Sequence, residues 1–419
     1  MVWMLGVTET ISYGVLIYSV AVFLSPMRKE LHASLGELSG AVSLSLAMTG
    51  LSAPLVGKWL DKHGARLLMT LGSLLGALSV VGWANAHSLP QLYLSFAGIG
   101  VAGAAVYYEA AFATINKWFY RDRASALLTV TVIAGFASTI FLPGSQFLIN
   151  HFGWRHALLV LAGLVALCAI PHALVLRRDP ADHGLGQDGD PIDINQVSAL
   201  SNTLKSKAEM KSEVRVARAQ REVRWLTVAY VTSNIATTIV MVLLVTYLLS
   251  RGYMPGAAAL GAGLIGVMSV AGRIAITSFA RKFRLARLAA VTSVGQAFGI
   301  AALVWLPRPT GLILFIFAFG AGFGIMTIAR VALLGEYVDT SVFARVSGGQ
   351  ALAVNIARVL APVTAGLIIG ATDGYGLTLA AVAFCSVLSA VALLFSDAAA
   401  QSATNHTSQT PLRSDRKGV

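Results

Sequence analysis

The sequence predicts an all-α integral membrane protein whose twelve transmembrane helices form two six-helix bundles. Hydrophobic residues make up 56% of the 419 residues, charged residues only 12%, and the mean hydropathy is +0.72. Soluble domains carry about 25% charged residues, so this chain lacks the polar surface of a water-exposed fold. The apolar residues gather in twelve runs, and one long polar segment separates the sixth run from the seventh.

Each apolar run is long enough to cross a bilayer as a helix, which takes roughly 20 residues for a hydrocarbon core of about 30 Å. The runs are continuously apolar, which excludes the alternating strands of a membrane barrel. The first run lacks a basic leader and contains Glu9, so we expect a retained helix and not a signal peptide. The expected spans are 3–25, 36–57, 66–86, 91–116, 124–149, 155–176, 224–249, 257–280, 286–306, 311–335, 345–369 and 374–396.

The polar segment from Arg177 to about Glu222 leaves six spans on each side. This equal division predicts two repeated bundles. The segment is acidic and then basic, which is typical of a solvated linker with a surface helix; a lipid-headgroup or regulatory role is the alternative. The expected parts are an N-terminal bundle at 1–176, a cytoplasmic central loop at 177–223, a C-terminal bundle at 224–396 and a disordered cytoplasmic tail at 397–419.

The cationic side chains predict the orientation of the chain. If the first helix starts in the cytoplasm, the loops and tails on that side hold 23 of the 31 Lys and Arg residues, and the opposite side holds five. Cytoplasmic loops carry such an excess. We therefore expect a multi-pass protein of the cytoplasmic (inner) membrane with both termini in the cytoplasm. Arg28 and Lys29, just after the first span, oppose this rule locally.

Five charged residues lie inside the predicted spans: Glu9 and Glu109 in the first half, and Arg273, Arg330 and Arg358 in the second. A charge at the bilayer centre costs about 2.5–3.5 kcal/mol on insertion scales, so these side chains must face one another or water. Their segregation predicts a wet cavity between the halves. The three arginines would form an anion site, and the two carboxyls opposite would carry protons.

Each of these charges also has a structural interpretation that the sequence leaves open. Arg273 and Arg358 could belong to structural ion pairs, and Glu109 could lock an arginine across the interface. Arg330 could extend to the membrane surface or pair with Glu336. Glu9 is open to the same structural interpretation as Glu109.

Polar side chains near these charges in the sequence are candidate substrate contacts. Tyr107 and Tyr108 precede Glu109, and Tyr13 lies one turn beyond Glu9. Tyr230, Asn234 and Thr237 lie in the seventh span, spaced so that at least two share a face. The competing interpretation is ordinary hydrogen bonding between helices.

The loop between the second and third spans reads GKWLDKHGAR over residues 57–66. Glycine at position 64 allows a positive φ, and the carboxylate at position 61 can accept hydrogen bonds from a helix N-terminus. The loop resembles the signature GxxxD(R/K)xG(R/K)(R/K) of the major facilitator superfamily, with Ala65 in place of one basic residue. With the twelve spans, this resemblance covers about residues 1–396 and implies an alternating-access fold. It assigns to the cytoplasmic gate Gly57, Asp61, Lys62, Gly64 and Arg66.

Further stretches resemble the monocarboxylate porter and oxalate/formate antiporter branches of that superfamily. The run at 117–124 is similar to the basic start of their fifth helix, and residues 153–155 to the start of their sixth. In those families an arginine on helix 8 binds the substrate carboxylate, and Arg273 stands at the matching place. Arg358 is similar in position to the cation on helix 11 of the antiporters.

The chain departs from the porters at the residues that would couple transport to protons. Ser269 stands where the porters have an acid one turn before the helix 8 arginine, and their helix 1 lysine is absent. The resemblance therefore leaves proton coupling to Glu109 or Glu9.

The leading functional hypothesis is a secondary transporter that moves a small organic anion, expected to be a carboxylate, by alternating access and proton symport. The alternative is proton-antiport efflux of drugs or of a metalloid oxyanion. Pro143 and Gly144 in the fifth span occur in the reverse order of the pair that drug antiporters have there, which disfavours the drug alternative.

The sequence disfavours an enzyme or a non-transporting sensor. It shows no nucleophile paired with a base, no spacing typical of a metal site and no polar segment long enough for a folded extramembrane domain. We expect no cofactor, no metal and no nucleic-acid partner. The expected partners are the small anionic substrate, protons and the lipid bilayer, and the expected assembly is a monomer.

Overall fold

The computed structural model confirms an all-helical membrane architecture. It describes residues 1–178, 180, 184–190, 216, 220–279, 283–338 and 340–408, without the side chains of 61, 124, 276–279, 340–345 and 403–408. Within this part, eleven stretches are long and apolar enough to cross a membrane. One of them, Ser125–Val175, has 51 residues and turns at Gly153, where φ is 75°. At 1.5 Å per residue it would measure about 75 Å, so it makes two crossings and the predicted twelve are present.

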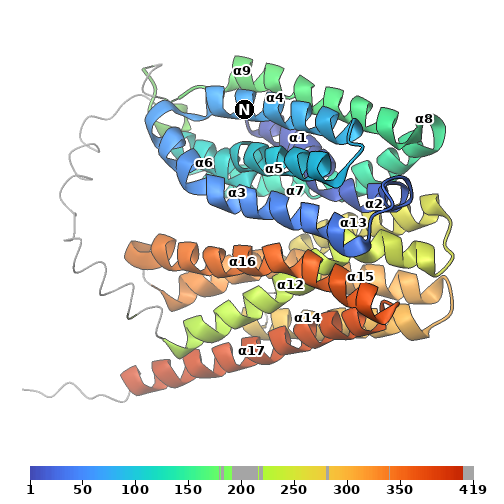
Figure 1. Ribbon diagram of the computed structural model, residues 1–419. Coiled ribbons are helices and arrows are strands. Elements are labelled where there is room, and N and C mark those ends of the chain that lie inside the picture. Colours follow the sequence, from blue (N-terminus) through green and yellow to red (C-terminus); the bar gives the residue numbers. More distant parts are fainter. Residues whose placement is uncertain are drawn as a thin grey trace, which may run out of the picture.

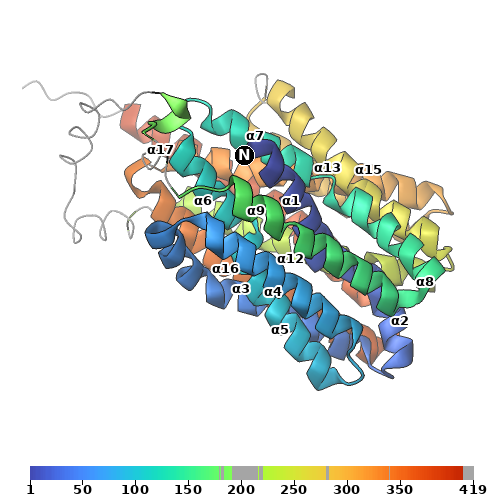
Figure 2. The ribbon, with the colours of Figure 1, turned by 90° about the horizontal axis from the view of Figure 1, so that it is seen from above.

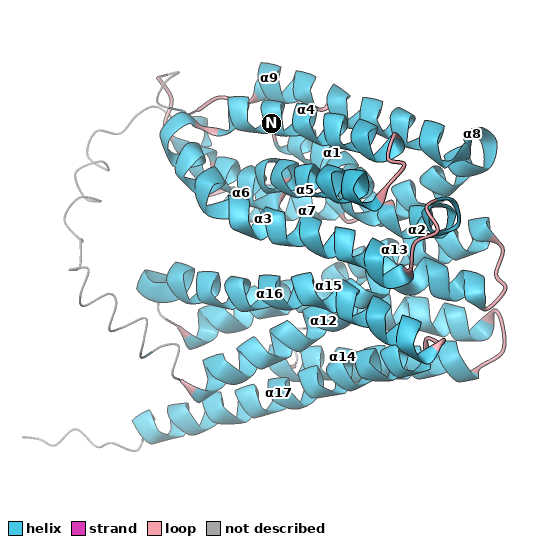
Figure 3. Cartoon of the chain, in the orientation of Figure 1, coloured by secondary structure: helices cyan, strands magenta, loops and turns pink. Residues whose placement is uncertain are grey.

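The two halves lie as two layers of helices (Figures 1 and 3). The N-terminal layer contains α1 (Val2–Tyr13), the π-helical η1 (Gly14–Tyr18), α2 (Val20–Glu30), α3 (Leu35–His63), α4 (Ala65–Ala84), α5 (Leu89–Val106), α6 (Tyr108–Trp118), α7 (Arg123–Ala134), α8 (Ala137–Leu167) and α9 (Ala169–Val175). The C-terminal layer contains α12 (Arg221–Ser250), α13 (Pro255–Phe279), α14 (Leu285–Trp305), α15 (Thr310–Tyr337), α16 (Thr340–Thr372) and α17 (Gly376–Ser408). Figure 2 shows α4 beside α5 in the N-terminal layer.

Four spans of the N-terminal half are interrupted, where the sequence predicted continuous helices: the sixth at Cys168 between α8 and α9, and three others next to the central cavity. The first span changes to π-helix at Gly14–Tyr18. The fourth span breaks at Tyr107, whose ψ of −179° is extended, and the fifth breaks at Gly135 and Phe136. Irregular backbone at membrane depth is tolerated where it lines a cavity or is buried in protein. Residues at or beside these last three breaks line the central cavity described below.

The halves touch mainly near one end of the bundle. Twelve crossings return the chain to the side on which it began, so Met1 and Ser408 lie on one side, here called the terminal side, and the opposite side is the far side. Toward the far side, α3 packs on α16 and α8 packs on α13. A Cβ added to Gly366 would lie 3.0 Å from the Cα of Gly36, and Thr139 donates to the carbonyl oxygen of Gly263 at 2.8 Å.

The last helix extends further than the sequence predicted. We expected a disordered tail from residue 397, but α17 is continuous to Ser408. Asp397 anchors it: this carboxylate is 4% exposed, pairs with Arg284 at 2.8 Å and accepts from Nε of Arg287 at 3.2 Å, both at the start of α14. Most of the expected central loop, and the tail from residue 409, lie outside the described residues.

One described part of the central loop, the short helix η3 (Gln187–Gly189), is tied to the turn between α6 and α7. The Asp188 carboxylate accepts from the backbone N–H groups of Arg121 at 2.8 Å, Tyr120 at 3.1 Å and Asp122 at 3.4 Å. These bonds hold the pKa of Asp188 below its ordinary value, and the bond from Arg121 has the largest effect. Arg121 also pairs with Asp190 at 2.8 Å. This stretch is therefore docked on the protein, where the sequence predicted a solvated linker.

The substitution Asp188→Asn tests this docking. Because the folded state lowers its pKa, Asp188 supports docking fully at pH values above 3.8, and this support is lost as the pH falls through the lowered pKa. At neutral pH we therefore expect faster hydrogen exchange of the backbone amides at 120–122 in Asp188→Asn. Asp190→Asn is the control, because Asp190 contacts the Arg121 side chain. Equal exchange in Asp188→Asn and the unmodified protein would contradict the assignment.

Candidate functional site

A cavity of about 400 Å³ lies between the two halves, within the size range of ligand pockets. A second space of about 240 Å³ adjoins it, and the two share Ile17, Leu46, Glu109 and Arg358. The second space follows α3 through Gly57 to Leu60, close to the terminal end of that helix. The combined cavity therefore extends from the middle of the bundle toward the terminal side.

Four of the five charged residues singled out in the sequence line the larger cavity: Glu109, Arg273, Arg330 and Arg358. Glu109 comes from the N-terminal half, and the three arginines come from α13, α15 and α16 of the C-terminal half. The structure thus brings these charges together at one interface, as their position in the sequence predicted.

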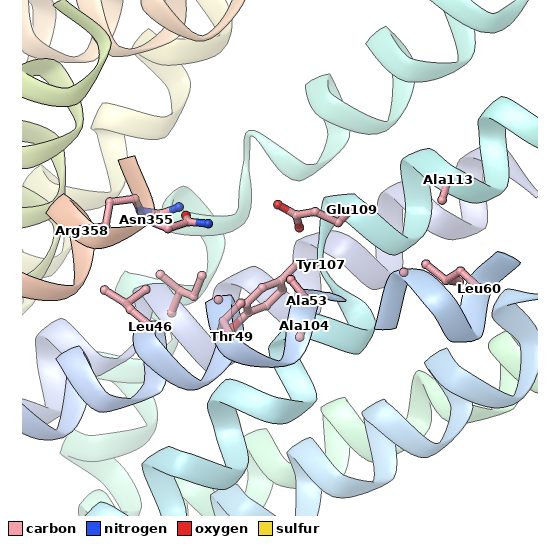
Figure 4. A pocket seen from close by; sticks show the side chains of 13 residues that line it. Leu46, Thr49, Ala53, Leu60, Ala104, Tyr107, Glu109, Ala113, Asn355 and Arg358 are labelled. Carbon is pink, nitrogen blue, oxygen red and sulfur yellow. The ribbon is translucent and has the colours of Figure 1, made fainter. Parts of the chain in front are cut away.

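Arg358 has the least engaged of the three guanidinium groups. It is half-buried on α16 and lines both parts of the cavity. Among the described residues it has no hydrogen-bond or ion-pair partner. Figure 4 shows Arg358 and Asn355 of α16 pointing across the cavity toward Glu109. A guanidinium group in this position can present two N–H donors to a carboxylate.

Arg273 is held by the other half of the protein. It is 8% exposed, and Nη1 donates to the carbonyl oxygen of Thr131 at 2.8 Å. Thr131 lies in the last turn of α7, where helix carbonyls carry a partial negative charge. The guanidinium also hydrogen bonds to Tyr108, and its buried Nε has no protein partner in the described part. Arg273 therefore joins the halves through neutral acceptors and not through the ion pair that we considered.

Arg330 stacks on an aromatic ring. Its guanidinium carbon lies 4.5 Å from the ring centre of Tyr230 on α12, and Nη1 lies 3.5 Å from Oγ of Ser347. This cation–π contact replaces the two alternatives considered from the sequence. Asn234, one turn from Tyr230, donates to the Tyr230 carbonyl oxygen at 2.9 Å, and both side chains line the cavity with Thr237.

The two carboxyl groups have different surroundings. Glu109 is the second residue of α6, directly after the helix break, and its side chain is exposed to the cavity. Glu9 in α1 is 0% exposed, and neither carboxyl oxygen has a hydrogen-bond partner among the residues that the structure describes. An ionised carboxylate without donors is very costly to bury, so the surroundings of Glu9 suit a neutral acid.

Aromatic side chains of the N-terminal half form a cluster beside these charges. The Tyr13 ring centre lies 4.6 Å from those of Tyr107 and Tyr108 and 6.5 Å from that of Tyr18. Phe112 stacks on Tyr108 at 5.0 Å. Tyr13, Tyr107 and Tyr108 were predicted from the sequence as candidate contacts, whereas Tyr18 and Phe112 were not. Tyr18 lies about one helical turn after Tyr13, and Phe112 lies one turn after Tyr108. This spacing could have indicated that they share a face with the predicted residues.

The predicted gate residues lie at the terminal end of α3 and the start of α4. Gly57 lines the cavity, Lys62 is exposed, and Gly64 ends α3 with a φ of 76°. Nε of Arg66 donates to the carbonyl oxygen of Ala173 in α9, within the same half. The Asp61 side chain lies outside the described part. Their role as a gate stays a prediction.

Comparisons with known proteins agree with this architecture. The sequence profile of the Major Facilitator Superfamily matches residues 9–362. Monocarboxylate transporter 11 of Mus musculus is 31% identical over 182 residues, which is 43% of this chain and 39% of that protein. Monocarboxylate transporter 1 of Homo sapiens is 30% identical over 174 residues, 41% of this chain and 34% of that protein. The matched part thus spans less than half of either relative. Monocarboxylate transporter 13 of Bos taurus is 27% identical over 334 residues, 78% of this chain and 72% of that protein.

Solved structures share the fold at low sequence identity. A D-xylose-proton symporter superposes with a TM-score of 0.71 and 14% identity, over 93% of this chain and 97% of that one. A bacterial homologue of the human lysosomal transporter Spinster, in an inward-facing and occupied conformation, gives 0.65 and 14%, over 97% and 96%. Since the family match covers most of the twelve-helix chain, the protein belongs to the major facilitator superfamily, a family of transporters and not of enzymes.

Proposed function

We propose that this protein is a secondary transporter that carries a small organic anion, a carboxylate, across the membrane together with a proton by alternating access. The observation that carries the proposal is the unpaired guanidinium group of Arg358 in a cavity between the halves. The similarity to monocarboxylate transporters supports the same substrate class.

Arg358 needs a counter-charge that the described protein does not supply. Guanidinium groups match the planar geometry of a carboxylate and form two parallel charge-assisted bonds with it. In a narrow cavity those bonds are stronger than in bulk water because the effective dielectric constant is lower. A substrate carboxylate bound to Arg358 would supply this charge at the interface that must close.

Proton coupling follows from Glu109, which faces Arg358 across the same space (Figure 4). When Glu109 is ionised, it competes with the substrate for the guanidinium and repels an incoming anion. When it is protonated, it does neither. Binding one anion and one proton therefore leaves the cavity charge unchanged, and the loaded halves can close without burying an additional charge. Glu9, buried within the same half, is the alternative residue that could carry the proton.

The arrangement corresponds to a state open toward the terminal side. The cavity follows α3 to Leu60 on that side, and the α3–α16 and α8–α13 contacts close the far side. The excess of cationic loops on the terminal side supports a cytoplasmic location for that side, and the state would then be the inward-open one of a transporter in the cytoplasmic membrane. The loop at 57–66 would form the gate when the terminal side closes.

Replacing Arg358 by Ala tests the substrate site. We expect carboxylate binding to weaken by about 10- to 100-fold, the equivalent of losing a charge-assisted hydrogen bond of about 1.5–3 kcal/mol. Binding is measured by titrating the purified protein with a carboxylate, and transport is measured in proteoliposomes. Arg224→Ala is the control, because Arg224 is exposed at the start of α12 and does not line the cavity. Unchanged carboxylate uptake by Arg358→Ala, or drug efflux by the unmodified protein without carboxylate transport, would refute the proposal.

Replacing Glu109 by Gln tests the coupling. The amide keeps the size of the side chain but cannot ionise. Exchange of carboxylate across the membrane of preloaded liposomes should therefore persist, whereas accumulation driven by an imposed pH gradient should be lost. Both are measured with labelled substrate, and Glu9→Gln is compared in parallel. Normal gradient-driven accumulation in Glu109→Gln together with its loss in Glu9→Gln would assign the proton to Glu9 instead.

The tight contact at Gly366 tests alternating access. A Val side chain there should push α16 from α3 and weaken the far-side closure, because the nearest backbone atoms are already 3.0 Å from a Cβ. Opening of the far side is reported by Ser43→Cys in a background without native cysteines. Ser43 on α3 is 6% exposed, so a cysteine there should be labelled only when the contact opens. We expect faster labelling by an impermeant maleimide from the far side. Gly370→Val is the control, because nothing lies within 4 Å of a Cβ there. Equal labelling in both variants would argue against the proposed closure.

A further inference from the structure

The three arginines of the cavity differ in whether the protein supplies partners for their guanidinium groups. Arg273 donates to Thr131 and Tyr108, and Arg330 stacks on Tyr230. Only the guanidinium of Arg358 has no such partner among the described residues. Glu109 lies on the facing wall. Arg358 therefore offers one unoccupied site for a carboxylate group, beside two guanidinium groups that the protein already holds in place.

The wall that faces these arginines is aromatic. Tyr13, Tyr18, Tyr108 and Phe112 all line the larger cavity, and their rings form a continuous cluster with neighbouring centres 4.6–6.5 Å apart. This spacing falls in the range of offset and edge-to-face aromatic pairs, so the cluster leaves ring surfaces and edges on which another ring can pack. Charged or strongly hydrated parts of a ligand gain nothing from such a wall.

The free guanidinium and the aromatic cluster are close to each other. Arg358 lines the larger cavity together with Tyr13 and Tyr18, and it lines the adjoining space together with Tyr107. A carboxylate bound to Arg358 therefore places its substituent beside the rings. The cavity of about 400 Å³ has room for a ring-sized substituent, and a two- or three-carbon acid would leave most of it filled with water. An aromatic cation, which the rings alone could bind, is disfavoured by the three guanidinium groups.

We propose that the transported carboxylate is an aromatic monocarboxylate, bound through its carboxylate to Arg358 and through its ring to the cluster of Tyr13, Tyr18, Tyr108 and Phe112. This inference rests on the proposed carboxylate transport and specifies its substrate. The Arg358 guanidinium binds the carboxylate group, and the cluster selects the ring. Tyr13 contacts most of the other rings in the cluster, so it contributes most to this selection.

The experiment measures binding and counterflow of carboxylates with the purified full-length protein. The probes are phenylacetate, cyclohexylacetate of similar bulk, acetate and lactate, and the dicarboxylate succinate. We expect phenylacetate to bind at least about 100-fold more tightly than acetate, because of the additional buried carbons. It should also bind about two- to tenfold more tightly than cyclohexylacetate, because of the ring–ring contacts. Tyr13→Leu should remove the preference over cyclohexylacetate, and Tyr13→Phe should keep it.

Thermal unfolding of each variant in detergent shows that it is folded, and Tyr120→Ala, in the exposed turn before α7, is the control that should keep the full preference. Tighter binding of acetate, lactate or succinate than of phenylacetate would overturn the inference and leave carboxylate transport standing. Equal binding of phenylacetate and cyclohexylacetate would overturn the aromatic part in the same way. Absence of binding and counterflow for every carboxylate would overturn the proposed function itself.

Discussion

The structure depends on one constraint, that a charge or an unpaired backbone group cannot be left facing hydrocarbon. Without water, each such group needs a protein partner or a wet cavity. This chain has five charged side chains at membrane depth and four interrupted spans. Four of the charges and residues at or beside three of the interruptions meet in one cavity between the halves. The division into two bundles therefore provides a shared interior surface that accommodates most of these costly groups.

Two of the interruptions lie where charged side chains meet the cavity. Beside the break after α7, Arg273 of the other half donates to the carbonyl oxygen of Thr131 at 2.8 Å, which also accepts from the backbone N–H of Gly135 at 3.0 Å. The break at Tyr107 begins a new helix whose second residue is Glu109, which directs that side chain into the cavity. A continuous helix at Tyr107 would have turned the Glu109 carboxyl elsewhere. The break at Tyr107 is thus what brings an acidic group to the cavity wall that faces Arg358.

The sequence was sufficient for the parts that depend on local composition. The spans and the gap near Arg177 follow from runs of apolar residues, and the clustering of Glu109 with the arginines follows from the cost of burying charge. The breaks at Gly14–Tyr18 and Tyr107 were not predictable, because they depend on packing against residues far away in the chain. For the same reason the sequence did not give the partner of Arg273 or the end of α17 beyond Asp397.

The unequal engagement of the three arginines gives the interface a physical division of roles. Arg273 holds the halves together through a helix carbonyl, a bond that does not require an ion and so can be exchanged for another acceptor when the halves move. Arg330 is neutralised in part by the Tyr230 ring, which keeps its position independent of substrate. Arg358 is the one of the three without a partner among the described residues, and in the proposed mechanism its partner is the substrate. If the halves closed over an empty cavity with Glu109 ionised, Arg358 would pair with Glu109 and the halves would close without substrate. If they closed over a bound anion with Glu109 protonated, Arg358 would pair with the anion. The distribution of partners, more than the number of cations, is therefore what would link binding to movement.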